Sequence, residues 1–182
     1  MPRPDSPYWQ IGSAWAGATP SAGPFGAPEN LGWWFTLDID TKVAGFAWFT
    51  DGRSPDFVLF QLWDATRALV AEQAISGKES KRVPAGPGWR NIWVHPRPRL
   101  IAGAPYLVNA NLTSFSANFG ALVAAPIVNG HITVLRNGTS PQSANGVYEA
   151  DTDTSGRFAF VNPPNDPTVG HWYAVDVLFE IP

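Results

Sequence analysis

The residues of this chain with the widest chemical use are its three histidines, His95, His131 and His171. None belongs to a His-x-x-x-His or His-x-x-Glu-His motif, in which two imidazoles on one helix face bind zinc. The chain has no cysteine, which excludes disulfides, thiolate metal sites and cysteine nucleophiles. We therefore expect the histidines to be surface or structural residues.

The signatures of acyl transfer and nucleotide binding are also missing, since the sequence contains no Gly-x-Ser-x-Gly, Walker or Gly-x-Gly-x-x-Gly motif. A glycosidase needs two carboxyl groups that face each other across a cleft. The chain does have acids close together in sequence, but such acids are ordinary at turns and strand ends of β-proteins: Asp38, Asp40, Asp51, Asp56 and Asp64. We predict no catalytic residue, no cofactor and no enzymatic activity.

The strongest metal candidate is the segment DTDTSGRFAFVN, which matches the first half of a calcium loop at Asp151, Asp153, Ser155 and Gly156. Its twelfth position is Asn162, where such a loop has a bidentate glutamate. A hairpin turn between GVYEAD and RFAFVN accounts for the same residues. We favour the turn and predict no metal site.

The segment GWRNIWV is a candidate glycan-binding surface. In a strand, Trp89, Asn91 and Trp93 share one face, and Ile92 and Val94 share the other. If the aliphatic pair points into a core, both indoles face outward, where flat rings can stack on sugars. The alternative is that these tryptophans pack under a loop or against a neighbouring subunit. The same basic and aromatic mixture suits single-stranded nucleic acid, but one short cluster on a chain of net charge −3 does not predict that partner.

The composition predicts one well-packed β domain. The chain has 182 residues, of which 35 are Gly or Pro (17 plus 18), and 13% are aromatic. So many helix-breaking residues argue against a helix bundle, and so many aromatic residues argue against a disordered chain. Charge is uneven: residues 78 to 99 carry six basic residues against Glu79, and residues 149 to 182 carry six acids against Arg157. These regions either pair across an interface or are solvated loops of one domain.

From residue 31 onward, short apolar and aromatic runs alternate with turn residues, as in an all-β domain. These runs are LGWWFTLD, TKVAGFAWFT, FVLFQLWD, ALVAEQAI, WRNIWVH, PYLVNANLT, HITVLRN, GVYEAD, RFAFVN and HWYAVDVLFE. The last run alternates, with Tyr173, Val175, Val177, Phe179 and Ile181 on one face and Trp172, Asp176 and Glu180 on the other, which predicts a central strand with one buried face.

Two segments are harder to assign. Residues 64 to 75, DATRALVAEQAI, are rich in helix formers behind an N-cap residue. We favour a tight turn at Asp64 to Arg67 that joins two antiparallel strands, because the preceding run has strand composition. Residues 114 to 129 are expected to form a long, partly ordered connection.

Residues 1 to 30 are rich in Pro, Gly and Ala and show no periodicity, so we predict an extended N-terminal arm before a sandwich domain of residues 31 to 182. The arm nevertheless contains large aromatic residues that need cover from water, and these are the candidate docking residues: Tyr8, Trp9, Trp15 and Phe25. Either the arm wraps its own domain, or it docks on a neighbouring subunit or partner.

Six strings of the chain, taken in order, resemble a bacterial β-sandwich family that is known only as a domain of unknown function. They are VAGFAWF, LFQLWDATRALVAE, GWRNIWV, LIAGAPYLVNA, NGVYEA and HWYAVDVLF. The family occurs in secreted multidomain surface proteins and in minor tail proteins of actinobacterial phages. The resemblance covers residues 31 to 182, and it implies an all-β, jelly-roll-like antiparallel sandwich without known catalytic machinery. The chain departs from the pattern in DGRSPDF, where a loop rich in Gly and Asn is expected, and in the spacing of Trp and Asp in HWYAVDV.

We therefore expect a non-enzymatic structural or interaction protein of a phage virion, either a minor tail protein or a surface decoration protein. Its expected partners are other virion proteins or further copies of itself in a homo-oligomer. No secretory signal and no membrane span is recognisable, and release by lysis would bring a virion protein outside the cell. The alternative is a carbohydrate-binding or adhesive module that recognises a host cell-wall glycan in an extracellular or cell-surface setting. No nucleic-acid or membrane partner is expected.

Overall fold

The computed structural model describes residues 8–9, 21–50, 58–75, 88–118, 122–141, 145–150, 172–173 and 175–180. Its regular structure consists of strands, and no helix occurs among these residues. The strands are β1 (Tyr8–Trp9), β2 (Ser21–Leu37), β3 (Thr41–Thr50), β4 (Val58–Asp64), β5 (Leu69–Ile75), β6 (Gly88–Trp93), β7 (Arg99–Leu100), β8 (Tyr106–Asn118), β9 (Ile127–Asn129), β10 (Ile132–Val134), β11 (Val147–Ala150), β12 (Trp172–Tyr173) and β13 (Val175–Glu180).

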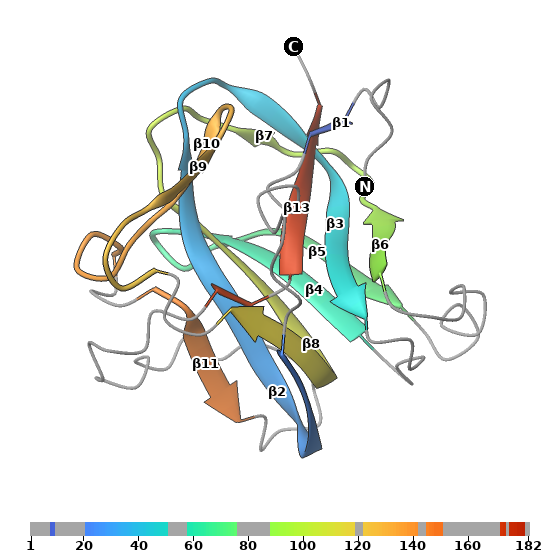
Figure 1. Cartoon of the computed structure of the whole chain (residues 1–182). Helices are drawn as coiled ribbons and strands as arrows, with labels where there is room; N and C mark the ends of the chain where they lie inside the picture. The colour runs from blue at the N-terminus through green and yellow to red at the C-terminus, as the bar shows by residue number, and fades with distance from the viewer. Residues whose placement is uncertain are drawn as a thin grey trace.

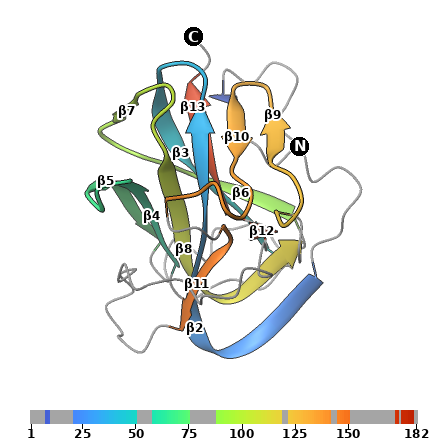
Figure 2. The same ribbon diagram turned by 90° about the vertical axis from the view of Figure 1, so that its left-hand side faces the viewer.

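The strands form two antiparallel sheets that face each other as a sandwich (Figure 1). The five-stranded sheet has the order β1-β13-β3-β6, with β7 paired to β3. The eight-stranded sheet has the order β5-β4-β8-β2-β10-β9, with β11 paired to β2 and β12 paired to β8. In Figure 2 this larger sheet runs from β5 on the left to β9 on the right. The expected all-β fold is thus confirmed, while the jelly-roll connectivity stays a prediction.

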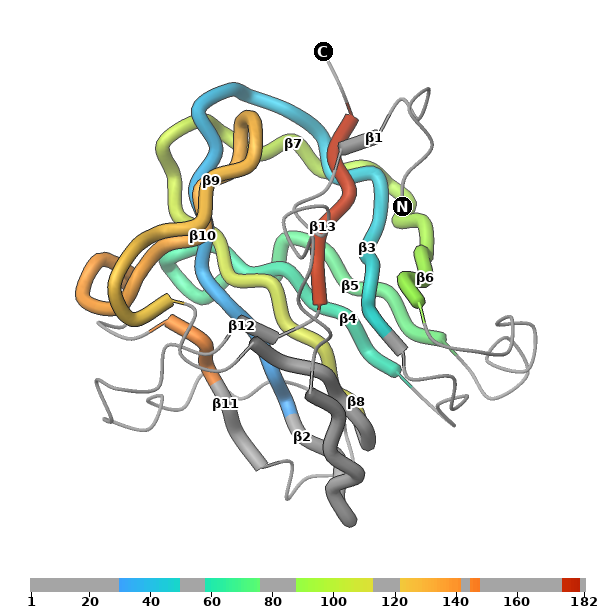
Figure 3. Tube along the Cα trace, viewed as in Figure 1, coloured from blue at the N-terminus to red at the C-terminus, as the bar shows by residue number. Residues whose placement is uncertain are grey.

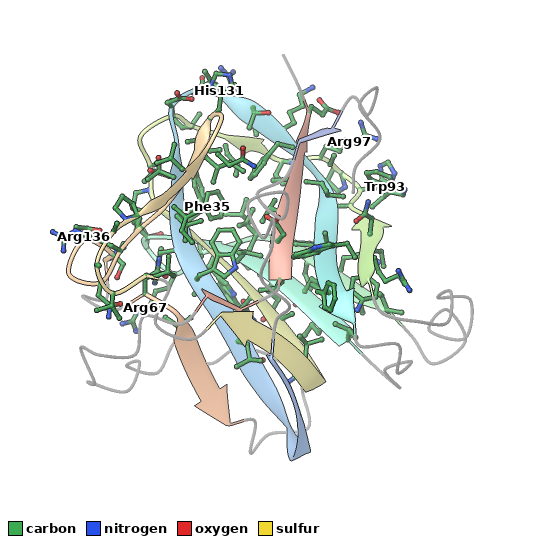
Figure 4. The ribbon with its side chains drawn as sticks, in the orientation of Figure 1. Phe35, Arg67, Trp93, Arg97, His131 and Arg136 are labelled. Carbon is green, nitrogen blue, oxygen red and sulfur yellow. The ribbon has the colours of Figure 1, made fainter. Side chains whose placement is uncertain are left out.

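Aromatic side chains from both sheets fill the space between the layers. Phe46 and Phe60 stack with their ring centroids 5.5 Å apart, and Phe35 meets Phe179 edge to face at 5.8 Å. Figure 4 shows Phe35 between the two sheets. Trp33, which is fully buried, donates from Nε1 to the carbonyl oxygen of Val175 at 2.8 Å. The core therefore joins the sheets by a hydrogen bond as well as by apolar contact.

β13 lies between β1 and β3, which confirms the predicted central strand, and its predicted face of Val175, Val177 and Phe179 is buried. The opposite face is buried as well. Residues Val175 to Phe179 are all buried, and Asp176 is fully so. The carboxylate of Asp176 accepts the backbone N–H of Val177 at 2.7 Å, which satisfies part of its need for hydrogen bonds. The predicted single strand is also divided, because β12 pairs with β8 in the other sheet.

The turn between β4 and β5 confirms the predicted hairpin. Asp64 organises it, since its Oδ1 accepts the backbone N–H groups of Thr66 at 2.8 Å and Ala68 at 3.0 Å, and the Thr66 hydroxyl at 2.7 Å. Arg67 completes the turn with φ of 73°, a left-handed conformation that residues other than glycine seldom adopt. The N-cap residue read from the sequence therefore caps a turn instead of a helix.

The side chain of Asn145 lies between two strand pairings on the edge of β2 that faces away from β8. That edge of β2 pairs with β11 through Glu29–Gly32 and with β10 through Phe35–Leu37. Between these ladders, Asn145 behaves like a peptide group: its Oδ1 accepts Trp34 N–H at 2.6 Å, and its Nδ2 donates to Trp34 O at 2.9 Å and to Leu135 O. Asn145 is fully buried, and together with the Leu135 N–H, which donates to Trp34 O at 2.9 Å, it satisfies the backbone of Trp34 between the two ladders.

Two strands extend into segments for which the sequence predicted no strand. β2 begins at Ser21, and its residues Ser21–Pro24 pair with β8 residues Ala117–Ser114. The ladder thus lies partly in the range expected to be arm and partly in the range 114 to 129 expected to be a connection. The small residues there have low strand propensity, and each strand is stabilised by the other. Trp15 lies outside the described residues, and docking by residues 1 to 30 stays a prediction.

Candidate functional site: the β6 surface and the edge of β13

β6 is an edge strand of the five-stranded sheet and carries the predicted glycan-binding residues. Trp93 is 45% exposed and Asn91 is exposed, whereas Val94 beside them is buried. Trp89 instead packs edge to face on Phe49, with the ring centroids 6.0 Å apart, and covers small residues of the sheet. Of the expected indole pair, the structure places one ring at the surface, on the β6 side of the molecule (Figure 4), and one in a packing role.

The arginines near these tryptophans bind acceptors of the same chain. Arg90 donates from Nη1 to the Trp89 carbonyl at 3.0 Å, Arg99 pairs with Asp40 at 2.6 Å, and Arg97 pairs with Glu180. The last pair joins the basic stretch to the acidic one within a single chain. Intramolecular pairing is thus one outcome of the uneven charge distribution, although exposed and half-exposed pairs of this kind stabilise a fold only weakly.

Two described carboxylates, those of Asp38 and Asp40, bind groups around the β2–β3 turn. Asp40 accepts the Ala102 N–H at 2.8 Å as well as Arg99, and these contacts, the backbone hydrogen bond above all, hold the pKa of its carboxyl below the ordinary value. Asp38 binds Nδ1 of His131 at 2.6 Å and its N–H donates to the His131 carbonyl, so this histidine ties a hairpin tip to the β2–β3 turn. His95 is exposed. These placements fit the prediction that the histidines are surface or structural residues, His95 as a surface residue and His131 as a structural one.

Among the residues that the structure describes, no group of three or more His, Asp or Glu side chains could hold a metal ion. The calcium-loop candidates, Asp151, Asp153, Ser155 and Gly156, lie outside the described residues. So do Asp51, Asp56 and His171.

A set of buried amide side chains was missed in the sequence. We call it the amide row; it lies on the face of the eight-stranded sheet that points away from the core, and its members are at most 4% exposed: Asn30, Gln61, Asn109 and Asn111. Asn109 donates to Gln61 at 3.4 Å, Asn111 to Asn30 at 3.3 Å, and Gln61 to Glu72 at 2.8 Å. The alternation of Asn109 and Asn111 in LVNANLT was the one sequence pattern that could have indicated this row. Because the row is buried and its members bind one another, it fixes strand register instead of presenting a binding surface.

The edge of β13 that faces away from β3 is the second candidate site. Val175 O binds Trp33 Nε1, and Val177 N–H binds the Asp176 side chain. Since alternate residues of a strand direct their backbone groups to the same side, side chains occupy this stretch of the edge. The following residues accept a strand: Phe179 pairs with Trp9 and Glu180 with Tyr8 of β1, beside the upper end of β13 in Figure 1.

A scan against protein-family models and a search of curated proteins each found no match to the chain. The part of the chain that the structure describes also contains no helix long and apolar enough to span a membrane.

Proposed function

We propose that this chain is a non-enzymatic structural or interaction protein of a phage virion, either a minor tail protein or a decoration protein, that docks through its N-terminal segment. The observation that supports the proposal is the β1–β13 pairing, in which the backbone of the predicted docking residues Tyr8 and Trp9 adds to a sheet edge. Strand addition is a common way for one polypeptide to bind another. The resemblance to minor tail proteins supports the virion setting.

The direct test is mass spectrometry of purified phage particles, which should find this polypeptide as a stoichiometric component. In the same particles, Trp9→Ala or Trp15→Ala should reduce incorporation while circular dichroism of the free protein stays unchanged. Asn91→Ala, on the opposite edge strand, is the matched control and should incorporate normally. Absence of the parent chain from particles, or equal incorporation of all variants, contradicts the proposal.

A second function, binding of a host cell-wall glycan, is favoured by the exposure of Trp93 and Asn91 on β6. Under this proposal Trp93→Ala abolishes retention on host cell-wall polysaccharide. Trp89→Phe keeps an aromatic ring in the packing position and should retain binding. Equal retention by the parent and Trp93→Ala would exclude the β6 surface as the glycan-binding site.

A further inference from the structure

The edge of the eight-stranded sheet at β9 is open and apolar. Among the described strands only β10 pairs with β9, which therefore ends this sheet on the right in Figure 2. Val128, at the centre of β9, is 62% exposed, and the apolar residues 123 to 126 before it are all exposed as well. A run of exposed apolar residues is typical of an interaction surface.

The hairpin of β9 and β10 directs the backbone of Val128 outward. On either side of β10, the carbonyl of His131 and the N–H of Leu135 both bind the backbone at β2. Hydrogen bonding alternates along an antiparallel strand, so the residues of β10 that bind β9 are the even-numbered ones. Their partners in β9 are Ile127 and Asn129. Val128, which lies between these two residues, therefore turns its N–H and its C=O to the free edge.

The β9 edge lacks the charged residues that commonly prevent sheet edges from associating. Residues 122 to 135 contain no Asp, Glu, Lys or Arg. By contrast, β5 at the other edge of the same sheet carries Glu72, and β6 at an edge of the smaller sheet carries Arg90. Charges on an edge strand disfavour pairing with the same edge of a second copy. At β9 a second copy meets no repulsion of this kind.

The free edge of β9 is complementary to itself about Val128. Two antiparallel copies of β9 related by a two-fold axis set Val128 opposite Val128, and their N–H and C=O groups then form two reciprocal hydrogen bonds. Pro126, the preceding residue on that side of the strand, has no N–H. A register shifted by two residues would set the Val128 carbonyl opposite the proline nitrogen, without a donor. The two-fold register is therefore the one that satisfies both backbone groups of Val128.

We propose that β9 is a self-association surface, at which two copies of this protein pair through Val128 and join their eight-stranded sheets into one. The two Val128 side chains, with Cβ atoms about 5 Å apart on one face, cover each other from water. The contact is small, so we expect a weak dimer whose population rises with concentration. This inference goes beyond the proposed function, which concerns docking by the N-terminal segment.

Sedimentation velocity of the full-length protein over a concentration series measures this dimer. Val128→Pro removes the N–H that the pairing uses in each copy but leaves the bonds of Ile127 and Asn129 to β10, and it should weaken dimerisation by about tenfold or more. Val128→Lys sets like charges opposite each other and should abolish the dimer. Leu69→Lys, at an exposed apolar position of β5, is the matched control and should dimerise like the parent.

Three outcomes of this series overturn the proposal. The first is a parent that stays monomeric at every concentration, which would leave the edge to a strand of a different protein. The second is dimerisation of the Val128 variants as tight as that of the parent. The third is a Leu69→Lys variant that is impaired as much as Val128→Lys.

A cysteine variant covers the case in which these variants fold poorly. The chain has no cysteine, so the single thiol of Val128→Cys can form a disulfide only with another copy. Opposite residues of a hydrogen-bonded pair have Cα atoms about 5.5 Å apart, within the range of a disulfide. Under gentle oxidation Val128→Cys should cross-link faster than Leu69→Cys at the same concentration, with unchanged circular dichroism. Equal rates overturn the pairing. Either result leaves the virion proposal to particle mass spectrometry, which does not depend on self-association.

Discussion

Replacing Asn145 with alanine should be among the most destabilising single changes in the described part of this protein. The side chain makes four hydrogen bonds, to Trp34 N–H and O, to Leu135 O and to Gly146 N–H at 2.9 Å, and it is fully buried. Each buried group left without a partner costs about 1–3 kcal/mol. Allowing for relaxation and entry of water, we expect a loss of about 3–5 kcal/mol in the free energy of unfolding.

Equilibrium unfolding in urea, followed by tryptophan fluorescence, measures this loss. With a slope of about 2 kcal/mol/M, the midpoint should fall by about 1.5–2.5 M. Asn145→Asp keeps the shape but turns a carboxylate toward two carbonyl oxygens, so it should be at least as unstable near neutral pH. Asn91→Ala, at an exposed position, should stay within about 0.5 kcal/mol of the parent. A loss below about 1 kcal/mol in Asn145→Ala would show that the amide is not a necessary link between the ladders.

Three further changes follow from single residues. Arg67→Gly relieves a left-handed backbone at φ of 73° and should raise stability by about 0.5–1 kcal/mol, seen as a higher thermal midpoint; a lower midpoint contradicts the reasoning. The pKa of the Asp64 carboxyl is lowered, chiefly by its hydrogen bond from the Thr66 hydroxyl, so the carboxylate stabilises the fold above the ordinary pKa of 3.8 and loses this effect as pH falls through the lower folded value. The difference in unfolding free energy between the parent and Asp64→Asn should therefore shrink in acid. A difference that does not change with pH would refute this. Gly45→Ala would place a Cβ 2.1 Å from the Ile92 carbonyl oxygen and should cost about 2–4 kcal/mol in chemical denaturation; parent-like stability would mean that β6 can move away.

The sequence predicted the fold class and most strands because their signals are local. Alternation in LGWWFTLD predicts that Trp33 and Phe35 point into the core, where they lie. The turn at Asp64 is predicted by the strand-like runs on either side of it. Other features depend on partners distant in the chain. The burial of Asp176 and the strand character of Ser114 to Asn118 follow from neighbours that no local pattern reveals.

The candidate site was predictable only in part. Periodicity placed Trp89 and Trp93 on one face of β6, but it could not show that Phe49 covers one indole, since that contact depends on the β3–β6 register. The acceptor edge of β13 was not predicted at all. It depends on Trp33, which lies 142 positions from Val175 in the chain, and on side-chain bonds that composition does not encode.

The position of β13 in the five-stranded sheet also bears on how the protein is made. In Figure 3 this late segment lies directly beside the early strand β3, and it also pairs with β1. The layer therefore cannot close until residue 180 has left the ribosome, so the side of β3 that pairs with β13 stays uncovered while residues 51 to 180 are synthesised. Such dominance of distant pairings slows folding and exposes a nascent chain to aggregation. Synthesis at reduced temperature or with chaperones present should consequently raise the yield of soluble protein.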